Sequence, residues 1–478
     1  MRMETRESEV TYPVGRRGLT KIAQDRASSK PHPNRPCCSV IPRRDVALQD
    51  GVRNHARGDC DETPTRLAPH LAYAGGFGSD QAMIQFEPEI DRSLFQETLQ
   101  FAKRQVRSLT EQHPGFYPLY TQDGKWQHDG PAWTHWCDGF LPGMMWIFQR
   151  TEAEGSPEKA YWTEKAKEYS LPLEPRQHDH DVHDLGFIFL STYYRWYQLT
   201  REPRLNDVLV QAGKTMALRF REKGQYLCSF VGDDSLFIDI MMNVGVVFYA
   251  ARETNDRKLR DIAIRHALTT RRYLVRGDGS TAHEGIFDTE TGEFLRSSTQ
   301  QGQRSDSCWS RGLAWSMYGF GSCFEYTRDP RFLQTAQACA DYFLTHTNAD
   351  GIPPWDFQAT AETRKTVDTS AAAIAAGALI RLCRMLPDPV KGFYYWSCAL
   401  RILKSLCLKY TDRTDDDWEG VLRGGVYHIH KDLGVDESVM WGEYFFCEAL
   451  ENALKFSPVN DKKTPAASSR LSSDGTQI

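Results

Sequence analysis

Two aspartates stand directly before aromatic-rich apolar segments, where packing alone does not require a charged residue. Asp138 lies in HWCDGFLPGMMW (135–146), and Asp184 lies in HDHDVHDLGF (178–187). If the two carboxylates face each other, repulsion and partial desolvation raise one pKa, so that one group is protonated near neutrality while the other is ionised. Glycoside hydrolysis uses such a pair. On spacing alone, two Asp helix caps explain the pattern equally well.

A third segment, QQGQRSDSCWSRGLAW (300–315), places Arg311 and Trp315 four residues apart on one face of a predicted helix. The guanidinium group offers paired donors for a carboxylate, and the indole offers a flat apolar surface for a sugar ring. In the alternative interpretation, Arg311 pairs with a structural Asp and Trp315 packs in the core. The sequence favours neither interpretation over the other.

The histidines and aspartates from His178 to Asp184 include residue types that ligate zinc or manganese. In an extended segment, however, alternating side chains point to opposite faces, and short His/Asp tracts before a helix are usually solvated. The sequence therefore predicts no metal site, and acid/base chemistry on a pair of carboxylates requires no organic cofactor.

Helices that are apolar on nearly every face recur along the chain, each after a polar opening. They begin near Asp138, Asp184, Asp239, Trp309, Asp368 and Glu437. Amphipathic helices alternate with them, at 91–110, 156–168, 203–221, 257–275, 330–345 and 389–410. Because an apolar helix must be buried while a striped helix faces solvent on one side, the alternation predicts an all-α fold, an (α/α)6 barrel. Asp239 and Asp368 are interpreted as helix N-caps.

Composition argues against several classes of protein. The 478 residues carry 58 Lys+Arg and 63 Asp+Glu, and this net charge of −5 favours no nucleic-acid or anionic-membrane partner. The apolar stretches are shorter than the ~18–20 residues that cross a bilayer. The twelve cysteines form no CxxC pair, and the N-terminus is charged. Reduced thiols and a cytoplasmic location are therefore expected.

Three regions are expected along the chain. Residues 1–75 form a disordered or poorly ordered tail, since the first 60 residues carry 12 Lys+Arg, 7 Asp+Glu and five prolines with little apolar periodicity. Residues 76–456 form the barrel domain. Residues 457–478, rich in Ser, Lys and Asp, form a second disordered tail.

Together these segments resemble the unsaturated glucuronyl hydrolases, glycoside hydrolase family 88. The matching pieces are WCDGFLPGMMW, HDLGF, IDIMMN (238–243), the QG and SDSCWSRGLAW pieces of 301–315, PPWDF (353–357) and DTSAAAIAA (368–376). The resemblance implies an (α/α)6 barrel that removes a 4,5-unsaturated uronic acid from the non-reducing end of lyase-generated oligosaccharides of the glycosaminoglycan type. It implies that the C4=C5 double bond is hydrated by acid/base catalysis and that this oligosaccharide is the partner.

The resemblance also implies roles for individual residues. Asp184 takes the place of the general acid/base, and Asp138 takes the place of the second essential carboxylate. The positions that line the sugar subsite are His283, Gln301, Arg311 and Trp315. The chain departs from the family at Gln300, where members often carry His, and its segment between the two aspartates is shorter than in some members.

Two alternative functions stay open at this point. The first is an enzyme of the same fold that acts on unsaturated rhamnogalacturonan fragments or on saturated sugars. The second is a catalytically silent carbohydrate-binding protein, which the presence of Asp138 and Asp184 disfavours. The sequence does not determine the oligomeric state.

Overall fold

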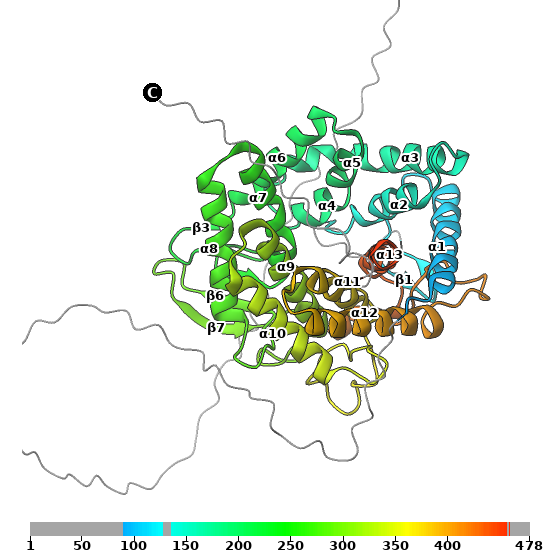
Figure 1. The fold of residues 1–478 in the computed structure, drawn as a ribbon. Helices are drawn as coiled ribbons and strands as arrows, with labels where there is room; N and C mark the ends of the chain where they lie inside the picture. Colours follow the sequence, from blue (N-terminus) through cyan, green and yellow to red (C-terminus); the bar gives the residue numbers. More distant parts are fainter. Residues whose placement is uncertain (1–88, 128–134, 457, 459–478) are drawn as a thin grey trace, which may run out of the picture. The chain divides into compact units, whose positions relative to one another are not determined.

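The computed structural model describes residues 89–127, 135–456 and 458. The expected tails, 1–75 and 457–478 apart from Pro458, lie outside the described residues, as do residues 76–88 and 128–134 of the expected barrel domain. The described part consists mainly of helices, with short strands between them (Figure 1).

The inner ring of the fold is made of helices that are buried on almost every side. Its members are α2 (Phe140–Thr151), α4 (Leu185–Ser191) continued by α5 (Tyr193–Thr200), α7 (Ile240–Thr254), α9 (Ser310–Thr327), α11 (Thr369–Met385) and α13 (Met440–Lys455). Contacts run from α2 through α4, α7, α9, α11 and α13 and back to α2, so the ring closes on itself.

The outer ring is made of amphipathic helices that each cover an inner neighbour. Its members are α1 (Arg92–Gln112), α3 (Pro157–Ser170), α6 (Pro203–Ala217), α8 (Arg257–Leu274), α10 (Pro330–His346) and α12 (Pro389–Lys409). In α1, for example, Phe95, Leu99 and Val106 face the core while most of the polar residues between them are exposed. The predicted (α/α)6 barrel is therefore confirmed, and most predicted helix limits lie within two or three residues of the observed ones.

The second inner segment differs from the prediction, because the helix that starts after Asp184 breaks at Thr192, where φ is −112° and ψ is −85°. The Ser191 hydroxyl donates to the carbonyl of Phe187, and the Thr192 hydroxyl donates to that of Ile188, 2.6 Å away. Hydroxyls that bond back to the preceding turn compete with the helix and bend it. The result is two short helices, α4 and α5.

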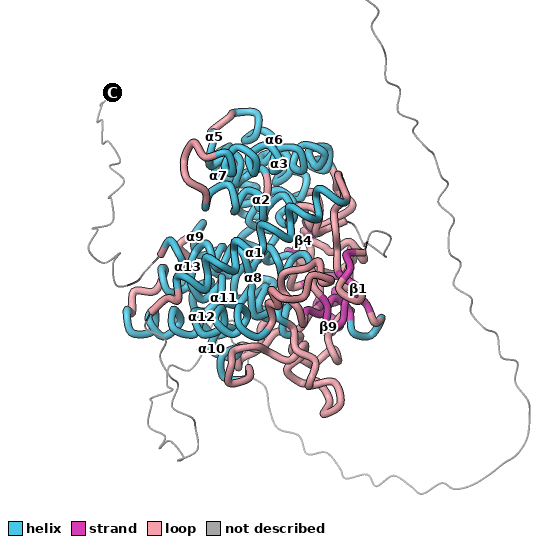
Figure 2. Tube along the Cα trace, turned by 90° about the vertical axis from the view of Figure 1, so that its right-hand side faces the viewer, coloured by secondary structure: helices cyan, strands magenta, loops and turns pink. Residues whose placement is uncertain are grey.

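The two ends of the barrel differ in their connections. Turns from an inner to an outer helix are short, at 152–156, 201–202, 255–256, 328–329 and 386–388, whereas the returning segments are long and carry the strands and short 3-10 helices. These are β1 (Thr121–Gln122), β2 (Lys125–Trp126), η1 (Leu171–His178), β3 (Phe220–Arg221), β4 (Tyr226–Leu227), β5 (Ser235–Phe237), β6 (Glu284–Phe287), β7 (Phe294–Ser298), β8 (Gly425–His428), η2 (Ile429–Lys431) and β9 (Leu433–Glu437). Figure 2 shows loops and strands gathered on one side of the helices.

All strand pairs in the described part of the chain are antiparallel. The order β5-β6-β7 makes a three-stranded sheet, and β1-β2, β3-β4 and β8-β9 are hairpins. Because each long segment ends at the N-terminus of an inner helix, these strands surround the end of the barrel at which the inner N-termini meet. The loops of this end are therefore placed to build a site.

The described cysteines are all free thiols, and of these nine only Cys383 is partly exposed rather than buried. They pack as small hydrophobes. Within residues 89–127 and 135–456, none of the helices combines the length and the apolar character that crossing a bilayer requires.

Candidate active site

A cavity of about 180 Å³ opens where the inner helices begin. Its walls come from the segments that lead into α4, α7 and α9 and from the β8 hairpin. The residues that line it are Trp136, His183, Asp184, Phe187, Phe230, Val231, Phe237, Asp239, Gln300, Gln301, Arg311, Tyr427, His428 and Lys431. Two of these residues are carboxylates, Asp184 and Asp239.

The close approach of α4 and α7 brings these two carboxylates into one cavity. A Cβ atom on Gly186 would lie 2.4 Å from Cα of Asn243, so only glycine lets the two helix starts meet. The Asn243 side chain then accepts a hydrogen bond from the backbone N–H of Phe187, over 2.8 Å. The HDLGF and IDIMMN segments are thereby fixed against each other, with an Asp at the start of each.

Asp239 is not a helix cap, and the interpretation of this residue from sequence was wrong. Its side chain makes no capping hydrogen bond to α7. Instead Oδ2 is buried, has no hydrogen-bond partner of full geometry among the described residues and lies 3.5 Å from Nε2 of His283. Burial alone would raise the pKa of Asp239, but the contact with His283 and the nearby charge of Arg311 lower it below its ordinary value.

Asp368, by contrast, is confirmed as a cap. Its Oδ1 accepts hydrogen bonds from the backbone N–H groups of Ser370 and Ala371, at 3.0 and 3.4 Å, and so satisfies the start of α11. Its Oδ2 lies 3.0 Å from Nη1 of Arg311, and both side chains are almost completely buried.

Each carboxylate of the cavity has a histidine beside it. Nε2 of His183 lies 3.3 Å from Oδ1 of Asp184. Nδ1 of His183 accepts a hydrogen bond from the backbone N–H of Phe230, and Nδ1 of His283 accepts from that of Gln300, both at 3.1 Å. A ring nitrogen that accepts from a backbone N–H carries no proton, so in the neutral tautomer the hydrogen of each ring is on Nε2 and faces the Asp. Burial lowers the pKa of His183, which favours this neutral form.

Arg311 lines the cavity from the first turn of α9, and its donors are largely occupied. Besides Asp368, its guanidinium group donates to the carbonyls of Val426 and Tyr427 and to the side-chain oxygen of Gln301. The ion pair with a structural Asp is the alternative that the sequence left open. Arg311 therefore holds Gln301 in the cavity wall and adds a fixed positive charge beside the two carboxylates.

The other residues expected at the sugar subsite lie behind the wall. His283 does not line the cavity but contacts Asp239 from the β6 side, between the rings of Phe237 and Trp309. Trp315 is 1% exposed and packs in the core, with its ring centre 5.1 Å from that of Phe187. Gln301 and Arg311 are thus brought to the cavity, whereas Trp315 supports it through Phe187.

Asp138 faces a different cavity, of about 680 Å³, which it shares with His135 and Arg176. Its Oδ2 lies 3.6 Å from Nη1 of Arg176 and 3.9 Å from Nδ1 of His135. Burial raises the pKa of Asp138 to about 6, although these two groups oppose the shift. The carboxylate that shares a cavity with Asp184 is therefore Asp239 and not Asp138, and the shift at Asp138 comes from burial and not from repulsion by Asp184.

The part of the chain that the structure describes contains no group of three or more His, Cys, Asp or Glu side chains that could hold a metal ion. The cavity instead offers two carboxylates, neutral imidazoles and a guanidinium group. This set can donate and accept a proton and can stabilise charge on a bound ring.

The fold is an (α/α)6 barrel, and two carboxylates share a cavity at the N-terminal ends of its inner helices. This combination is that of an (α/α)6-barrel glycoside hydrolase. The chain belongs to Glycosyl Hydrolase Family 88, whose family model matches residues 101–381.

Known proteins of this family resemble the chain over most of the barrel. The unsaturated glucuronyl hydrolase of Bacillus sp. (strain GL1) is 32% identical over 327 residues, 66% of this chain and 85% of the relative. A solved unsaturated glucuronyl hydrolase specific for heparin has a TM-score of 0.70 and 28% identity, covering 78% of this chain and 98% of its own. A mutant of the Streptococcus agalactiae enzyme in complex with dGlcA-GalNAc6S has a TM-score of 0.65 and 25% identity, covering 77% of this chain and 93% of its own.

Proposed function

We propose that this enzyme removes a 4,5-unsaturated uronic acid from the non-reducing end of glycosaminoglycan-type oligosaccharides, and that Asp184 and Asp239 carry the reaction. The observation that carries the proposal is that these two carboxylates line one cavity, next to the guanidinium group of Arg311. The names of the relatives support the substrate class: one solved relative is specific for heparin, and another binds dGlcA-GalNAc6S.

The substrate determines what the carboxylates must do. The C4=C5 double bond of an unsaturated uronic acid makes the ring an enol ether, so a proton added at C4 leaves positive charge at C5 and on the ring oxygen. Water then adds at C5 and gives up a proton to the base. The resulting hemiketal opens and releases the leaving sugar, so the glycosidic oxygen needs no direct protonation by the enzyme.

We assign the proton transfer to Asp239 and the stabilisation of positive charge to Asp184. The side chain of Asp239 is 15% exposed, against 5% for Asp184. Its Oδ2 is buried beside Nε2 of His283, which leaves Oδ1 to carry a proton toward a bound ring. Asp184, to which the resemblance gives the acid/base role, is the more deeply buried of the two carboxylates and lies beside Nε2 of His183, so we assign it the stabilising role.

The spacing of mutated residues in a relative supports this pair. Solved structures of the Streptococcus agalactiae enzyme include Asp-to-Asn mutants at two positions that are 60 residues apart. Here Asp184 and Asp239 are 55 residues apart, and Asp138 and Asp184 are 46 apart. The spacing in the relative is closer to that of the pair in the shared cavity.

The activity is tested by the absorbance of the conjugated double bond. We expect the full chain to bleach this absorbance with unsaturated chondroitin, hyaluronan or heparin disaccharides and to release one saturated sugar per bleached bond. A saturated disaccharide of the same composition is the control and should stay intact. Unchanged absorbance across the whole panel, or cleavage of the saturated control at a similar rate, would contradict the proposal.

The pH profile tests the role of Asp239. In the free enzyme, the contact with His283 and the charge of Arg311 lower the pKa of Asp239. A bound uronate adds a negative charge beside them and raises that pKa, so the acid gains its proton as the substrate binds. Because kcat/KM reports the free enzyme and kcat reports the complex, the alkaline fall of kcat should occur at higher pH than that of kcat/KM. Coincident falls, measured with unsaturated disaccharide over a broad pH range, would count against this role.

A further inference from the structure

A third cavity, of about 420 Å³, lies within the ring of inner helices and extends to the end of the barrel at which they end. Its walls come from α2, α4, α5, α7, α9, α11 and α13, and they run from early positions such as Phe140 and Met242 to the last turns of most of these helices. Phe187 lines both this cavity and the candidate active site, and its ring packs between those of Phe140 and Trp315, at 5.5 and 5.1 Å. Aromatic side chains thus lie between the two cavities, and this one has no part in the chemistry proposed above.

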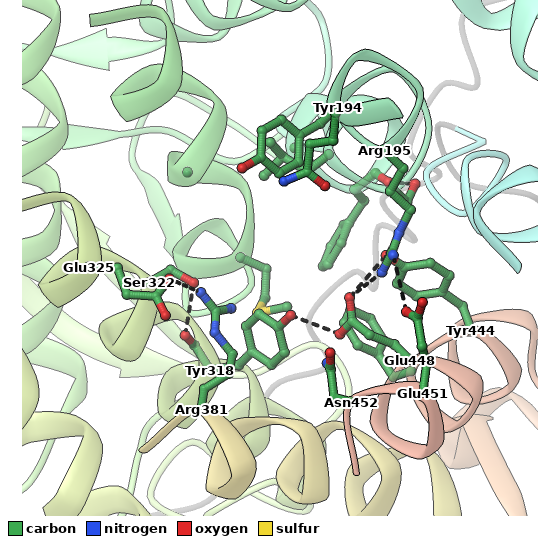
Figure 3. A pocket seen from close by; sticks show the side chains of 18 of the residues that line it. Tyr194, Arg195, Tyr318, Ser322, Glu325, Arg381, Tyr444, Glu448, Glu451 and Asn452 are labelled. Atoms are coloured by element: carbon green, nitrogen blue, oxygen red, sulfur yellow. Dashed lines mark hydrogen bonds and ion pairs between the residues drawn. The ribbon is translucent and has the colours of Figure 1, made fainter. Parts of the chain in front are cut away.

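Arginines outnumber acidic residues in this cavity. The arginines that line it are Arg150, Arg195, Arg252, Arg381 and Arg384, and the glutamates are Glu325, Glu448 and Glu451. Figure 3 shows side chains of both kinds on opposite walls, with Arg381 and Glu325 across from Arg195 and Glu448. The excess of positive charge favours a ligand that is negatively charged.

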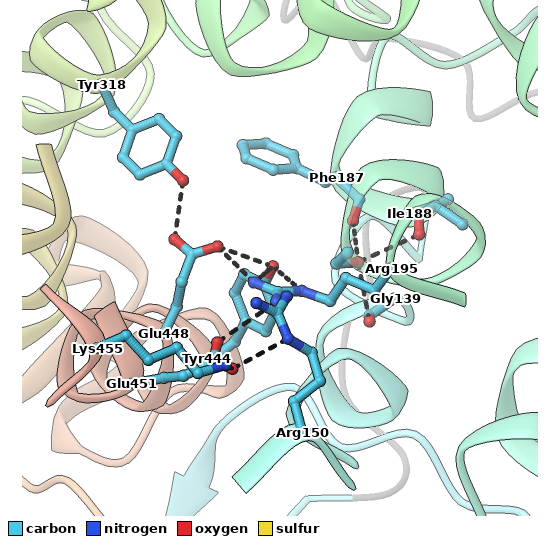
Figure 4. Close-up of polar contacts among 11 residues, drawn as sticks. Gly139, Arg150, Phe187, Ile188, Arg195, Tyr318, Tyr444, Glu448, Glu451 and Lys455 are labelled. Carbon is cyan, nitrogen blue, oxygen red and sulfur yellow. Dashed lines mark hydrogen bonds and ion pairs between the residues drawn. The ribbon is translucent and has the colours of Figure 1, made fainter. Parts of the chain in front are cut away.

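The three glutamates are already occupied. Glu448 accepts from Arg195 and from the hydroxyl of Tyr318, at 2.5 and 2.8 Å. Glu451 lies 3.2 Å from Nε of Arg150 and also pairs with Arg195 (Figure 4). Glu325 pairs with Arg381. Arg252 pairs with Glu253, which is not part of the lining. Arg384 is therefore the lining arginine without a carboxylate among the described residues.

Two arginines keep donors for a ligand. The side chain of Arg384 has no hydrogen bond or ion pair among the described residues, and its guanidinium group lies over the ring of Phe456. Arg150 pairs with Glu451 through Nε, and its two Nη groups make no hydrogen bond among the described residues. The ends of the inner helices carry partial negative charge, which accounts for part of the arginine excess. Neutralising this partial charge, however, requires only that the arginines lie near the helix ends. It does not explain why guanidinium donors beside the cavity have no partner.

Uncharged polar groups complete the lining. The side chains of Tyr194, Gln198 and Asn452 lie in the cavity wall and have no hydrogen-bond partner among the described residues. Hydroxyl and amide groups of this kind bind sugar hydroxyls, and the tyrosine ring offers an apolar face to a sugar ring. The volume lies within the range of small-molecule sites.

We propose that this cavity binds an anionic sugar, with its carboxylate or sulfate on Arg384 and Arg150 and its hydroxyls on Tyr194, Gln198 and Asn452. The site is separate from the candidate active site, so a ligand can bind there without displacing the substrate.

Calorimetric titration of the full chain tests the proposal. The probes are D-glucuronate for the carboxylate and N-acetylgalactosamine 6-sulfate for the sulfate, with N-acetylgalactosamine as the neutral comparison. We expect at least one anionic probe to bind about tenfold or more tightly than the neutral sugar. Binding of glucuronate alone would identify a uronate site, and binding of the sulfated sugar alone would identify a sulfate site.

A matched pair of variants locates the binding. Arg384→Gln should weaken the anionic probe about tenfold, while Arg296→Gln, the same change at an exposed arginine of β7 outside the cavity, should leave it unchanged. Both variants should turn over unsaturated disaccharide as the unchanged chain does. No binding of either anion, equal binding of the neutral sugar, or equal effects of the two variants would overturn the proposal. These binding results can be read whether or not the proposed hydrolase activity is found.

Discussion

Replacing Asp239 with Asn is expected to lower kcat on unsaturated disaccharides by roughly a hundredfold or more, since general acid/base groups contribute about that much. Asn keeps the size and shape of the side chain but cannot carry the proton to C4. KM should change much less than kcat, because binding depends on other groups of the cavity. Steady-state kinetics by absorbance, with circular dichroism to verify folding, checks the result.

The same change at Asp184 and at Asp138 provides the comparison with Asp239→Asn. Asp184→Asn should also lose most turnover, but its residual activity should keep the alkaline fall with pH, since the proton carrier is still present. Asp138→Asn should retain turnover within about tenfold, because Asp138 faces the cavity of Arg176 instead. A nearly inactive Asp138→Asn variant beside a fully active Asp239→Asn variant would show that the sequence-based pair was right and the pair in the shared cavity was not.

Replacing Asp368 with Ala is expected to lower the free energy of unfolding by about 3–5 kcal/mol, the usual cost of removing one partner from a buried ion pair. Asp368 is fully buried, caps α11 and pairs with Arg311, which is 1% exposed. Without it, the guanidinium group stays buried without its carboxylate. Activity should fall as well, because Arg311 fixes Gln301 in the cavity wall. Denaturant unfolding and kinetics measure both effects.

The chain offers a matched control for this change. Asp388 caps α12 with the same geometry, accepting from Val390 and Lys391 at 2.9 and 3.4 Å, but it is exposed at the surface. Asp388→Ala should therefore cost only about 1 kcal/mol, the value of a cap, and leave kcat unchanged. Similar losses in both variants would mean that the ion pair with Arg311 contributes little.

The helix pattern could be read from the sequence because it depends on local properties. Apolar stretches that are buried on all sides and striped stretches that face solvent differ in composition and periodicity. The break at Thr192 could not be read in this way, since the hydroxyl of Ser191 also donates to the carbonyl of Gly139, a residue 52 positions away. Such long-range contacts leave no periodic signal.

The candidate site could be predicted only in part. The resemblance placed Asp184, Gln301 and Arg311 in it, and the structure lines one cavity with all three. Asp239 was missed because an Asp before an apolar helix has the same sequence pattern whether it caps that helix or faces a cavity. Two signals in the sequence could have found Asp239. It lies within IDIMMN, one of the segments that match the family, and the segment between Asp138 and Asp184 is shorter than in some members, which questions that pair.

The sequence by itself determined the kind of protein, an all-helical double ring of one hydrolase family, because burial patterns and the order of motifs are properties of the chain alone. Only the tertiary structure decided which carboxylates meet. Asp184 and Asp239 share a cavity because Gly186 lets α4 approach the backbone of Asn243 in α7. That approach joins residues far apart along the chain, and no spacing along the sequence encodes it.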